Sequence, residues 1–92
     1  MAQHQTAEAQ KIESSSTANY ATFEGGIQQC YISADGDCYV TFDEQVPVVS
    51  GHALLIKANL APVRIDFRGG NVQKVRVISS GSVNVYVLGI RN

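Results

Sequence analysis

The feature that most constrains the fold is a rhythm of short alternating runs that begins at Tyr20. Runs rich in Val, Ile, Tyr, Phe and Thr are separated by Gly, Asp, Asn and Pro, a pattern typical of strands and turns. The runs recur about every nine residues, which favours a sandwich or barrel over alternating strands and helices. We therefore predict an all-β fold, a small antiparallel sandwich or barrel of about 7–8 short strands. The expected strands lie at residues 20–23, 27–32, 38–42, 46–49, 52–58, 63–67, 72–78 and 83–90.

Residues 1–19 differ from the rest and are predicted to form an extended polar N-terminal arm, with the β domain at residues 20–92. Ile12 is the only large aliphatic residue after Met1 in this segment, so it lacks an apolar face to pack into a core. Two alternatives stay open: a disordered tail, or an arm that becomes ordered on a partner. In either case, removing residues 1–18 is expected to leave the melting temperature nearly unchanged. The polar opening does not match a secretory signal peptide, so synthesis in the cytoplasm is expected.

Two cysteines, Cys30 and Cys38, flank a predicted turn and raise the question of a disulfide. A three-residue loop ending at Gly36 gives that glycine the left-handed position that such hairpins need. Ile32 then faces Cys38 and Cys30 faces Val40, so the two cysteines lie diagonally and too far apart for an unstrained bridge. A two-residue loop would place them on opposite faces. We expect two buried, reduced thiols.

The second predicted hairpin joins residues 63–67 to residues 72–78 through Gly69, Gly70 and Asn71. Hydrophobic and charged residues alternate in both runs, as expected for strands with one core face and one solvent face.

The last run, residues 83–90, is apolar on both faces. Because the apolar side chains on both faces must be buried from water, this pattern predicts a central strand or a contact between subunits. The predicted interface residues are Val83, Val85 and Val87 on one face and Tyr86, Leu88 and Ile90 on the other.

Charge is unevenly distributed along the chain, although the net charge is only −1. Acidic residues exceed basic residues by five in residues 20–56, and basic residues exceed acidic ones by five in residues 57–92. The two halves can pair within one molecule, or head to tail between copies. A basic field over the whole domain, as nucleic-acid binding would need, is absent, so nucleic acid is an unlikely partner. No apolar run is long enough for a membrane span.

No motif for catalysis, metal binding or a cofactor is present, so we expect a protein that is not an enzyme and has no metal or cofactor. His52 is the only histidine in the predicted domain, and no elbow-type nucleophile accompanies it. Tyr31 and Tyr39 fall on the outer face of the first predicted hairpin. This pair supports an alternative function, a β module that binds a glycan or single-stranded nucleic acid by stacking.

Three segments resemble small virion proteins of tailed bacteriophages, namely CYVTFD (38–43), GHALLIKAN (51–59) and VRVISSGSVNVYVLG (75–89). The resemblance is to the capsid decoration, or cement, and head-fibre class, and it covers residues 20–92 in style. It implies a non-enzymatic structural protein of the virion that forms a homo-oligomer, often a trimer, on the capsid. Its partners would be copies of itself and the major capsid protein or another virion protein. Accessory proteins of phage tails and baseplates have similar sequences in this respect.

Overall fold

The computed structural model describes residues 6–49 and 53–91, and the described chain contains strands and turns but no helix. Short alternating runs give short strands, because successive side chains of a strand point to opposite faces. The eight strands are β1 (Thr6–Ser14), β2 (Asn19–Ile27), β3 (Gln29–Ala34), β4 (Cys38–Phe42), β5 (Leu54–Ile56), β6 (Val63–Asp66), β7 (Val72–Ile78) and β8 (Val83–Arg91).

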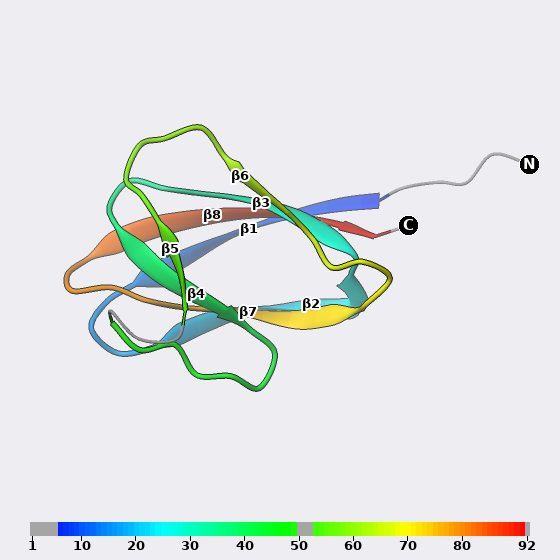
Figure 1. Cartoon of the computed structure of the whole chain (residues 1–92), viewed down its shortest axis with the longest axis horizontal. Coiled ribbons are helices and arrows are strands. Elements are labelled where there is room, and N and C mark those ends of the chain that lie inside the picture. Colours follow the sequence, from blue (N-terminus) through cyan, green and yellow to red (C-terminus); the bar gives the residue numbers. More distant parts are fainter. Residues whose placement is uncertain (1–5, 50–52, 92) are drawn as a thin grey trace, which may run out of the picture.

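The strands form two four-stranded antiparallel sheets. Sheet 1 has the order β1-β8-β3-β6 and sheet 2 has the order β2-β7-β4-β5. β1, β8 and β3 cross the upper half of Figure 1, and β2 and β7 cross the lower half. Except for the step from β4 to β5, each connection passes from one sheet to the other, which is the topology of a jelly roll. The prediction of an all-β sandwich is confirmed, and the alternative of a closed barrel is not.

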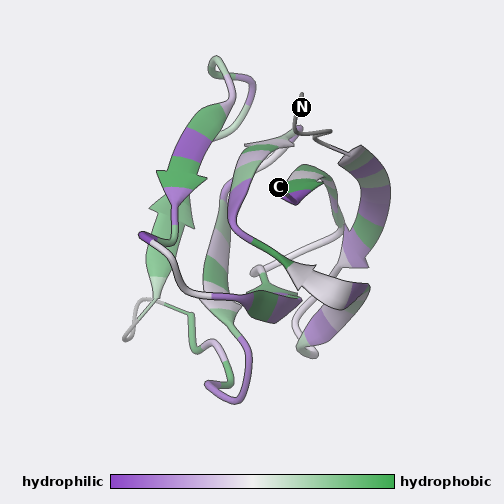
Figure 2. Cartoon of the chain, turned by 90° about the vertical axis from the view of Figure 1, so that its right-hand side faces the viewer, coloured by the Kyte–Doolittle hydropathy of each residue, from purple (hydrophilic) through white to green (hydrophobic). Residues whose placement is uncertain are grey.

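The core lies between the sheets and is built from alternate residues of their strands. Hydrophobic and hydrophilic bands therefore alternate along the strands in Figure 2. Phe23 and Ile27 of β2 are fully buried against the inward-facing valines of β7 and β8. The largest fully buried side chains also include Ile32, Val40, Ile56, Val75, Val77, Val85, Val87, Pro47, Cys30 and Cys38.

The N-terminal segment is part of the fold, which corrects the division into an arm and a domain at residue 19. β1 pairs with β8 along its whole length, from Thr6 opposite Arg91 to Ser14 opposite Val83. Ile12 is only 2% exposed, and the Ser14 hydroxyl hydrogen-bonds the Ser79 hydroxyl at 2.8 Å. One apolar side chain is enough for this strand, because the backbone groups that face β8 are paired in the sheet ladder and hold the strand in place without an apolar face of its own.

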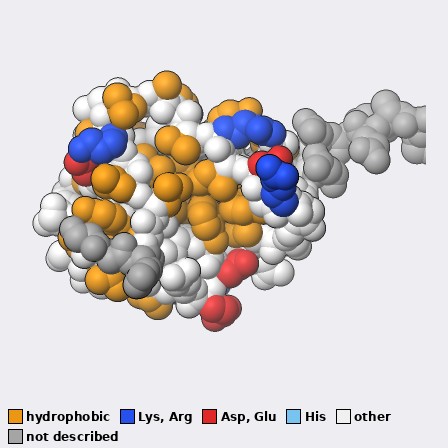
Figure 3. All heavy atoms as spheres, viewed as in Figure 1, with side chains coloured by type: hydrophobic (Ala, Val, Ile, Leu, Met, Phe, Trp, Pro, Cys, Tyr) orange, Lys and Arg blue, Asp and Glu red, His pale blue; other side chains and the backbone are white. Residues whose placement is uncertain are grey.

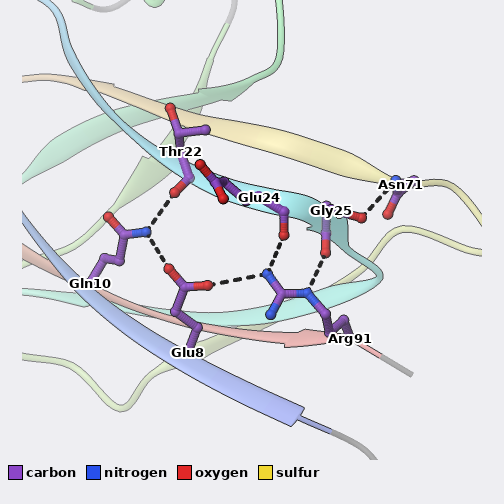
Figure 4. A network of polar contacts seen from close by, with 8 residues as sticks. Glu8, Gln10, Thr22, Glu24, Gly25, Asn71 and Arg91 are labelled. Atoms are coloured by element: carbon purple, nitrogen blue, oxygen red, sulfur yellow. Dashed lines mark hydrogen bonds and ion pairs between the residues drawn. The ribbon is translucent and has the colours of Figure 1, made fainter.

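Side-chain hydrogen bonds also fasten β1 to sheet 2 (Figure 4). Arg91, at the end of β8, donates to the Glu8 carboxylate at 3.1 Å and to the backbone oxygen of Glu24 at 2.7 Å. Gln10 donates to the Glu8 carboxylate at 2.7 Å and to the backbone oxygen of Thr22 at 2.6 Å. These contacts connect the edges of the two sheets on the side where β1 and β2 lie.

Neither predicted hairpin is present, because in both places the chain changes sheets. Between β3 and β4, the Asp35 carboxylate accepts from the backbone and side chain of Asn84, at 2.8 and 2.9 Å. Asp37 accepts from the backbone N–H of Ala58 at 2.8 Å and pairs with Lys57 at 3.0 Å. The two aspartates are thus held by different sheets, and this separates β3 from β4.

The predicted link between β6 and β7 fails for a similar reason. The N–H of Phe67 bonds the backbone oxygen of Gln28 at 3.0 Å, which continues the pairing of β6 with β3. Arg68 and Gly69 then adopt positive φ, 54° and 81°, and turn the chain into sheet 2.

Residues 46–49, predicted as a strand, form no strand. Asp43 has a φ of 56°, and its carboxylate accepts from the backbone N–H groups of Gln73 and Lys74 at 2.8 and 3.1 Å. This bend leads the chain away from sheet 2, while Pro47 packs into the core. The run predicted at 52–58 is reduced to β5, and His52 lies outside the described residues.

Candidate interaction surface

The outer face of sheet 1 carries an apolar patch centred on β8. The registers place Leu88 between Ala9 of β1 and Tyr31 of β3, and place Tyr86 between Lys11 and Ser33. Tyr86 is 46% exposed and Leu88 is 38% exposed. We call Ala9, Tyr31, Pro62, Tyr86 and Leu88 the outer patch.

The outer patch lines a shallow groove of about 630 Å³, together with Gln10, Lys11, Ser33 and Val87. Polar and charged groups surround it: Lys11 lies on the β1 side, and Arg64 and Asp66 lie on the β6 side. An apolar centre containing aromatic side chains inside a polar rim is the usual anatomy of a protein interface. The groove is therefore suited to a contact that excludes water.

The six interface residues predicted in the last strand divide between the core and the outer face. Val85 and Val87 are buried between the sheets, and Val83 is partly buried against the same core. Tyr86 and Leu88 are exposed on the other face, where Ile90 is half-buried. β8 is a central strand, which accounts for its inner apolar face, while the contact between subunits through its outer face stays a prediction.

Tyr31 and Tyr39 do not share a face, since β3 belongs to sheet 1 and β4 to sheet 2. Tyr31 lies beside Leu88, whereas Tyr39 lies between Ile78 and Leu55. The stacking platform that motivated the ligand-binding alternative is therefore not formed by these two tyrosines.

Sheet 2 has its own exposed aromatic residue, Tyr20 at 50% exposure. The Lys74 ammonium lies 4.7 Å and the Arg76 guanidinium 5.5 Å from the centre of its ring. Two cations over one ring give this face a basic character that the outer patch lacks.

Further exposed apolar side chains, not foreseen from the sequence, lie in residues 46–49 and 53–63. They are Val46, Val48, Val49, Leu54, Leu55, Leu60 and Val63. The rings of Phe42 and Phe67, which pack against the core, meet edge to face with their centres 4.9 Å apart. Figure 3 shows hydrophobic side chains gathered at the centre of the face it displays, with charged side chains of both signs around them. The runs VPVV and ALLI, which lack charges, were the available signal.

Both cysteines are free and fully buried, as predicted, although the hairpin register used to argue this is wrong. Burial raises the pKa of the Cys30 thiol to about 12. Burial, with a smaller contribution from Asp37, raises the pKa of Cys38 to about 11. Both thiols are therefore protonated and poorly reactive at neutral pH.

We expect both thiols to resist a water-soluble thiol reagent in the native protein at pH 8, because each is buried and protonated. Titration in denaturant without reductant should then reveal two thiols per chain. Rapid reaction of either thiol in the native protein would contradict the burial described here.

The described residues contain no group of three or more His, Cys, Asp or Glu side chains arranged to hold a metal ion. Among the same residues there is no helix that could cross a membrane. The best candidates for a functional site in the described chain are therefore the exposed apolar surfaces and the charged side chains around them.

Comparisons with known proteins show a likeness of fold. No family model matches the chain, and no curated protein matches it. A solved structure from work on Bacillus endospore appendages, described as a novel family of disulfide-linked pili, is similar with a TM-score of 0.53 and 11% sequence identity. The likeness covers 95% of this chain and 84% of that chain. The neighbour is not a phage protein, and the phage resemblance has no counterpart among the matches.

Proposed function

We propose that this protein is a non-enzymatic structural subunit that associates with copies of itself through the outer patch. The observation that carries the proposal is the exposure of Tyr86 and Leu88 on the central strand of sheet 1. Covering a large apolar side chain is worth roughly 1.5–3 kcal/mol, so a contact that buries several of them offsets part of the cost of association. The likeness of the fold to that of a pilus-forming protein supports an assembly role.

A second copy is the partner that the charges around the outer patch favour. Lys11 lies on the β1 side and has no ion pair among the described residues. Asp35 lies at the far end of β3, and its pKa is lowered chiefly by hydrogen bonds from Asn84, with a smaller contribution from Lys11 of the same copy, so it is ionised at neutral pH. A two-fold axis that runs through the patch parallel to the strands exchanges its β1 and β3 sides. Lys11 of each copy then approaches the side on which Asp35 of the other copy lies, which favours this orientation.

The proposed contact is non-covalent. The chain has only two cysteines, and both are fully buried in the core. An inter-subunit disulfide through either one would require the sandwich to open. In this respect the proposed assembly differs from the disulfide-linked pili of its structural neighbour.

The more specific form of the proposal is a capsid decoration protein of a phage virion, in which copies of the protein cover the capsid surface. It rests on the sequence resemblance at residues 38–43, 51–59 and 75–89. Copurification of the protein with virus particles would support it, and its presence only in host cells without particles would contradict it.

The test of self-association is the variant Tyr86→Asp. A buried, unpaired carboxylate is costly in a dry interface, so we expect the dissociation constant of the oligomer to rise roughly 100-fold or more. Sedimentation velocity would measure this. The matched control is Tyr20→Asp, which changes a tyrosine of similar exposure, 50% against 46%, on the other sheet.

The Tyr20 variant should keep the oligomer, and both variants should keep the β-sheet circular dichroism spectrum because both positions face outward. A wild-type protein that sediments as a monomer at the highest soluble concentration would overturn the proposal. So would equal loss of the oligomer in both variants.

A further inference from the structure

The four edge strands of the two sheets differ in how open they are to a further strand. In the described chain, β5 and β6 are short edges of three and four residues. β2 is longer, but its pairing shifts between Thr22 and Ile27, where Gly25 and Gly26 have φ near +80°. Short edges and bulges are devices that discourage edge-to-edge pairing. β1, with nine residues in unbroken register, has no such interruption.

The backbone groups on the free side of β1 follow from the pairing of β8. The backbone oxygens of Asn84 and Ile90 accept from Asp35 and Gln28, so even-numbered residues of β8 point toward β3. Odd-numbered residues of β8 therefore point toward β1, because backbone groups alternate sides along a strand.

The register places the odd-numbered β8 residues opposite even-numbered residues of β1. The N–H and C=O groups of Ala7, Ala9 and Lys11 consequently point away from the sheet. The next such carbonyl, that of Glu13, accepts from the Asn19 side chain at 3.1 Å, as expected for a group on the free side. Ala7, Ala9 and Lys11 are all exposed, and no hydrogen bond shown by the described residues covers this stretch.

We propose that the partner of this edge is the same edge of a second copy, paired antiparallel across a two-fold axis at Ala9. Ala9 then faces its own equivalent, and Ala7 of each copy faces Lys11 of the other. Each of these three pairs exchanges two backbone hydrogen bonds, about six in total. The result is one continuous eight-stranded sheet.

Charge favours this register over those centred on Glu8 or Lys11, each of which sets two like charges directly opposite each other. On the inner face, the proposed pairing sets Glu8 of each copy opposite Gln10 of the other, so no like charges meet. A two-fold axis at Lys11 would instead set two lysines directly opposite each other, which is destabilising. An axis at Ala7 would set Ala9 and Lys11 opposite residues that precede Thr6, the first described residue.

The two charged residues in the paired stretch of β1, Glu8 and Lys11, do not prevent the pairing. Glu8 points inward, and an inward charge on an edge strand can deter a partner. Its carboxylate is already paired with Arg91 at 3.1 Å, so it is compensated within each copy. Lys11 points outward and meets only the methyl group of Ala7 from the other copy.

The edge contact shares Ala9 with the outer patch but uses the backbone of this residue, and it rests on the proposed function only in having the same partner. Because Ala7, Ala9 and Lys11 have their side chains on the outer face of sheet 1, edge pairing would bring two outer patches side by side on one surface. The patch would remain free to contact further copies.

The first test is the variant Ala9→Pro, measured by sedimentation equilibrium. Proline removes the N–H of residue 9, which points to the free side of β1 and is not needed for the fold. Edge strands tolerate proline at such positions. We expect the edge dimer to weaken at least about tenfold, because each dimer loses two hydrogen bonds and gains two rings at its centre. Ala9→Ser, which keeps the N–H, should behave as wild type.

The second test is cross-linking through introduced cysteines. The two native thiols are buried, so they should not take part in the cross-linking. Directly opposed residues have Cα atoms about 5.5 Å apart, within disulfide range. Ala9→Cys should therefore give a covalent dimer on mild oxidation. Ala7→Cys alone should not, since the two copies of residue 7 lie roughly 13 Å apart along the strands. A mixture of Ala7→Cys and Lys11→Cys should.

The outcomes separate the edge from the patch. An oligomer that is lost in Tyr86→Asp but unaffected by Ala9→Pro, with no cross-link at residue 9, would overturn the edge pairing and leave the proposed function standing. Cross-linking at residue 9, with an assembly in Tyr86→Asp as large as that of the wild type, would support the edge and count against the patch. A wild-type monomer would overturn both.

Discussion

A chain that starts at Asn19 is expected to lose its cooperative fold. The deletion removes β1, all of whose described residues pair with β8, and takes Ile12 out of the core. It also removes Glu8, the ion-pair partner of Arg91, and leaves the edge of β8 that pairs with β1 without a neighbouring strand. A buried aliphatic side chain alone is worth roughly 2–5 kcal/mol when truncated, and domains of this size are stable by about 5–15 kcal/mol in total.

The measurement is far-ultraviolet circular dichroism during a thermal melt of the truncated and full-length chains. We expect a non-cooperative melt, or a fall in melting temperature of more than about 15 °C. Ile12→Ala in the full chain should give an intermediate loss. A synthetic peptide of residues 6–14 should restore part of the transition by pairing with β8. A truncated chain that melts like the full one would return these residues to the status of an arm.

The sequence predicts which residues are inside far better than it predicts which strands pair. The bounds of β4 and β7 agree with the predicted runs, and Val85 and Val87 face the core. Alternation sets these features, because a strand with one buried face must alternate. The alternation is the same whether the next strand lies in the same sheet or in the opposite one.

The choice of sheet is made by a few polar groups in the turns. The Asp35 carboxylate binds Asn84 of sheet 1, and the Asp37 carboxylate binds the backbone after β5 of sheet 2. The spacing of residues 30–42 does not indicate these long-range partners, so a hairpin is the simplest interpretation of the sequence alone. β1 is not predicted for a related reason. Its position depends on backbone pairing, which the hydropathy pattern of a sequence does not report.

The candidate interaction surface could be predicted in part. The two apolar faces of residues 83–90 led to Tyr86 and Leu88, and both lie exposed at the centre of the outer patch. Tyr31 joins them only because β3 pairs with β8, a fact of topology. For that reason its neighbour is Leu88 rather than the predicted Tyr39.

Two separate contacts on one subunit have a consequence for the assembly. An edge contact and a patch contact, each with its own two-fold axis, join every copy to two others. Such an arrangement closes into a ring-like complex or continues as a filament, depending on the angle between the axes. The proposals therefore predict that blocking only one contact leaves dimers, while blocking both leaves monomers.

Gly89→Ala is expected to be strongly destabilising although it adds a single methyl group. Gly89 is a buried residue of β8 that faces sheet 2. A Cβ atom there would lie 2.8 Å from Ile27 Cγ2 and 2.8 Å from Phe23 Cε1. Both neighbours are fully buried, so neither can swing away into solvent. Overpacking of this kind costs about 1–3 kcal/mol, which lowers the melting temperature of a domain of this size by roughly 5–20 °C.

The physical cause can be isolated with a double-mutant cycle read by thermal melts. Phe23→Leu removes the ring edge that meets the new methyl group, so Gly89→Ala should cost less in that background, with a coupling of about 0.5–3 kcal/mol. Gly81→Ala is the matched control, because an added Cβ there has no atom within 4 Å. It should be neutral or slightly stabilising, since alanine restricts the unfolded chain. Additive losses in the cycle, or equal losses for Gly81→Ala and Gly89→Ala, would mean that the close approach of β8 to Phe23 is not what requires glycine at position 89.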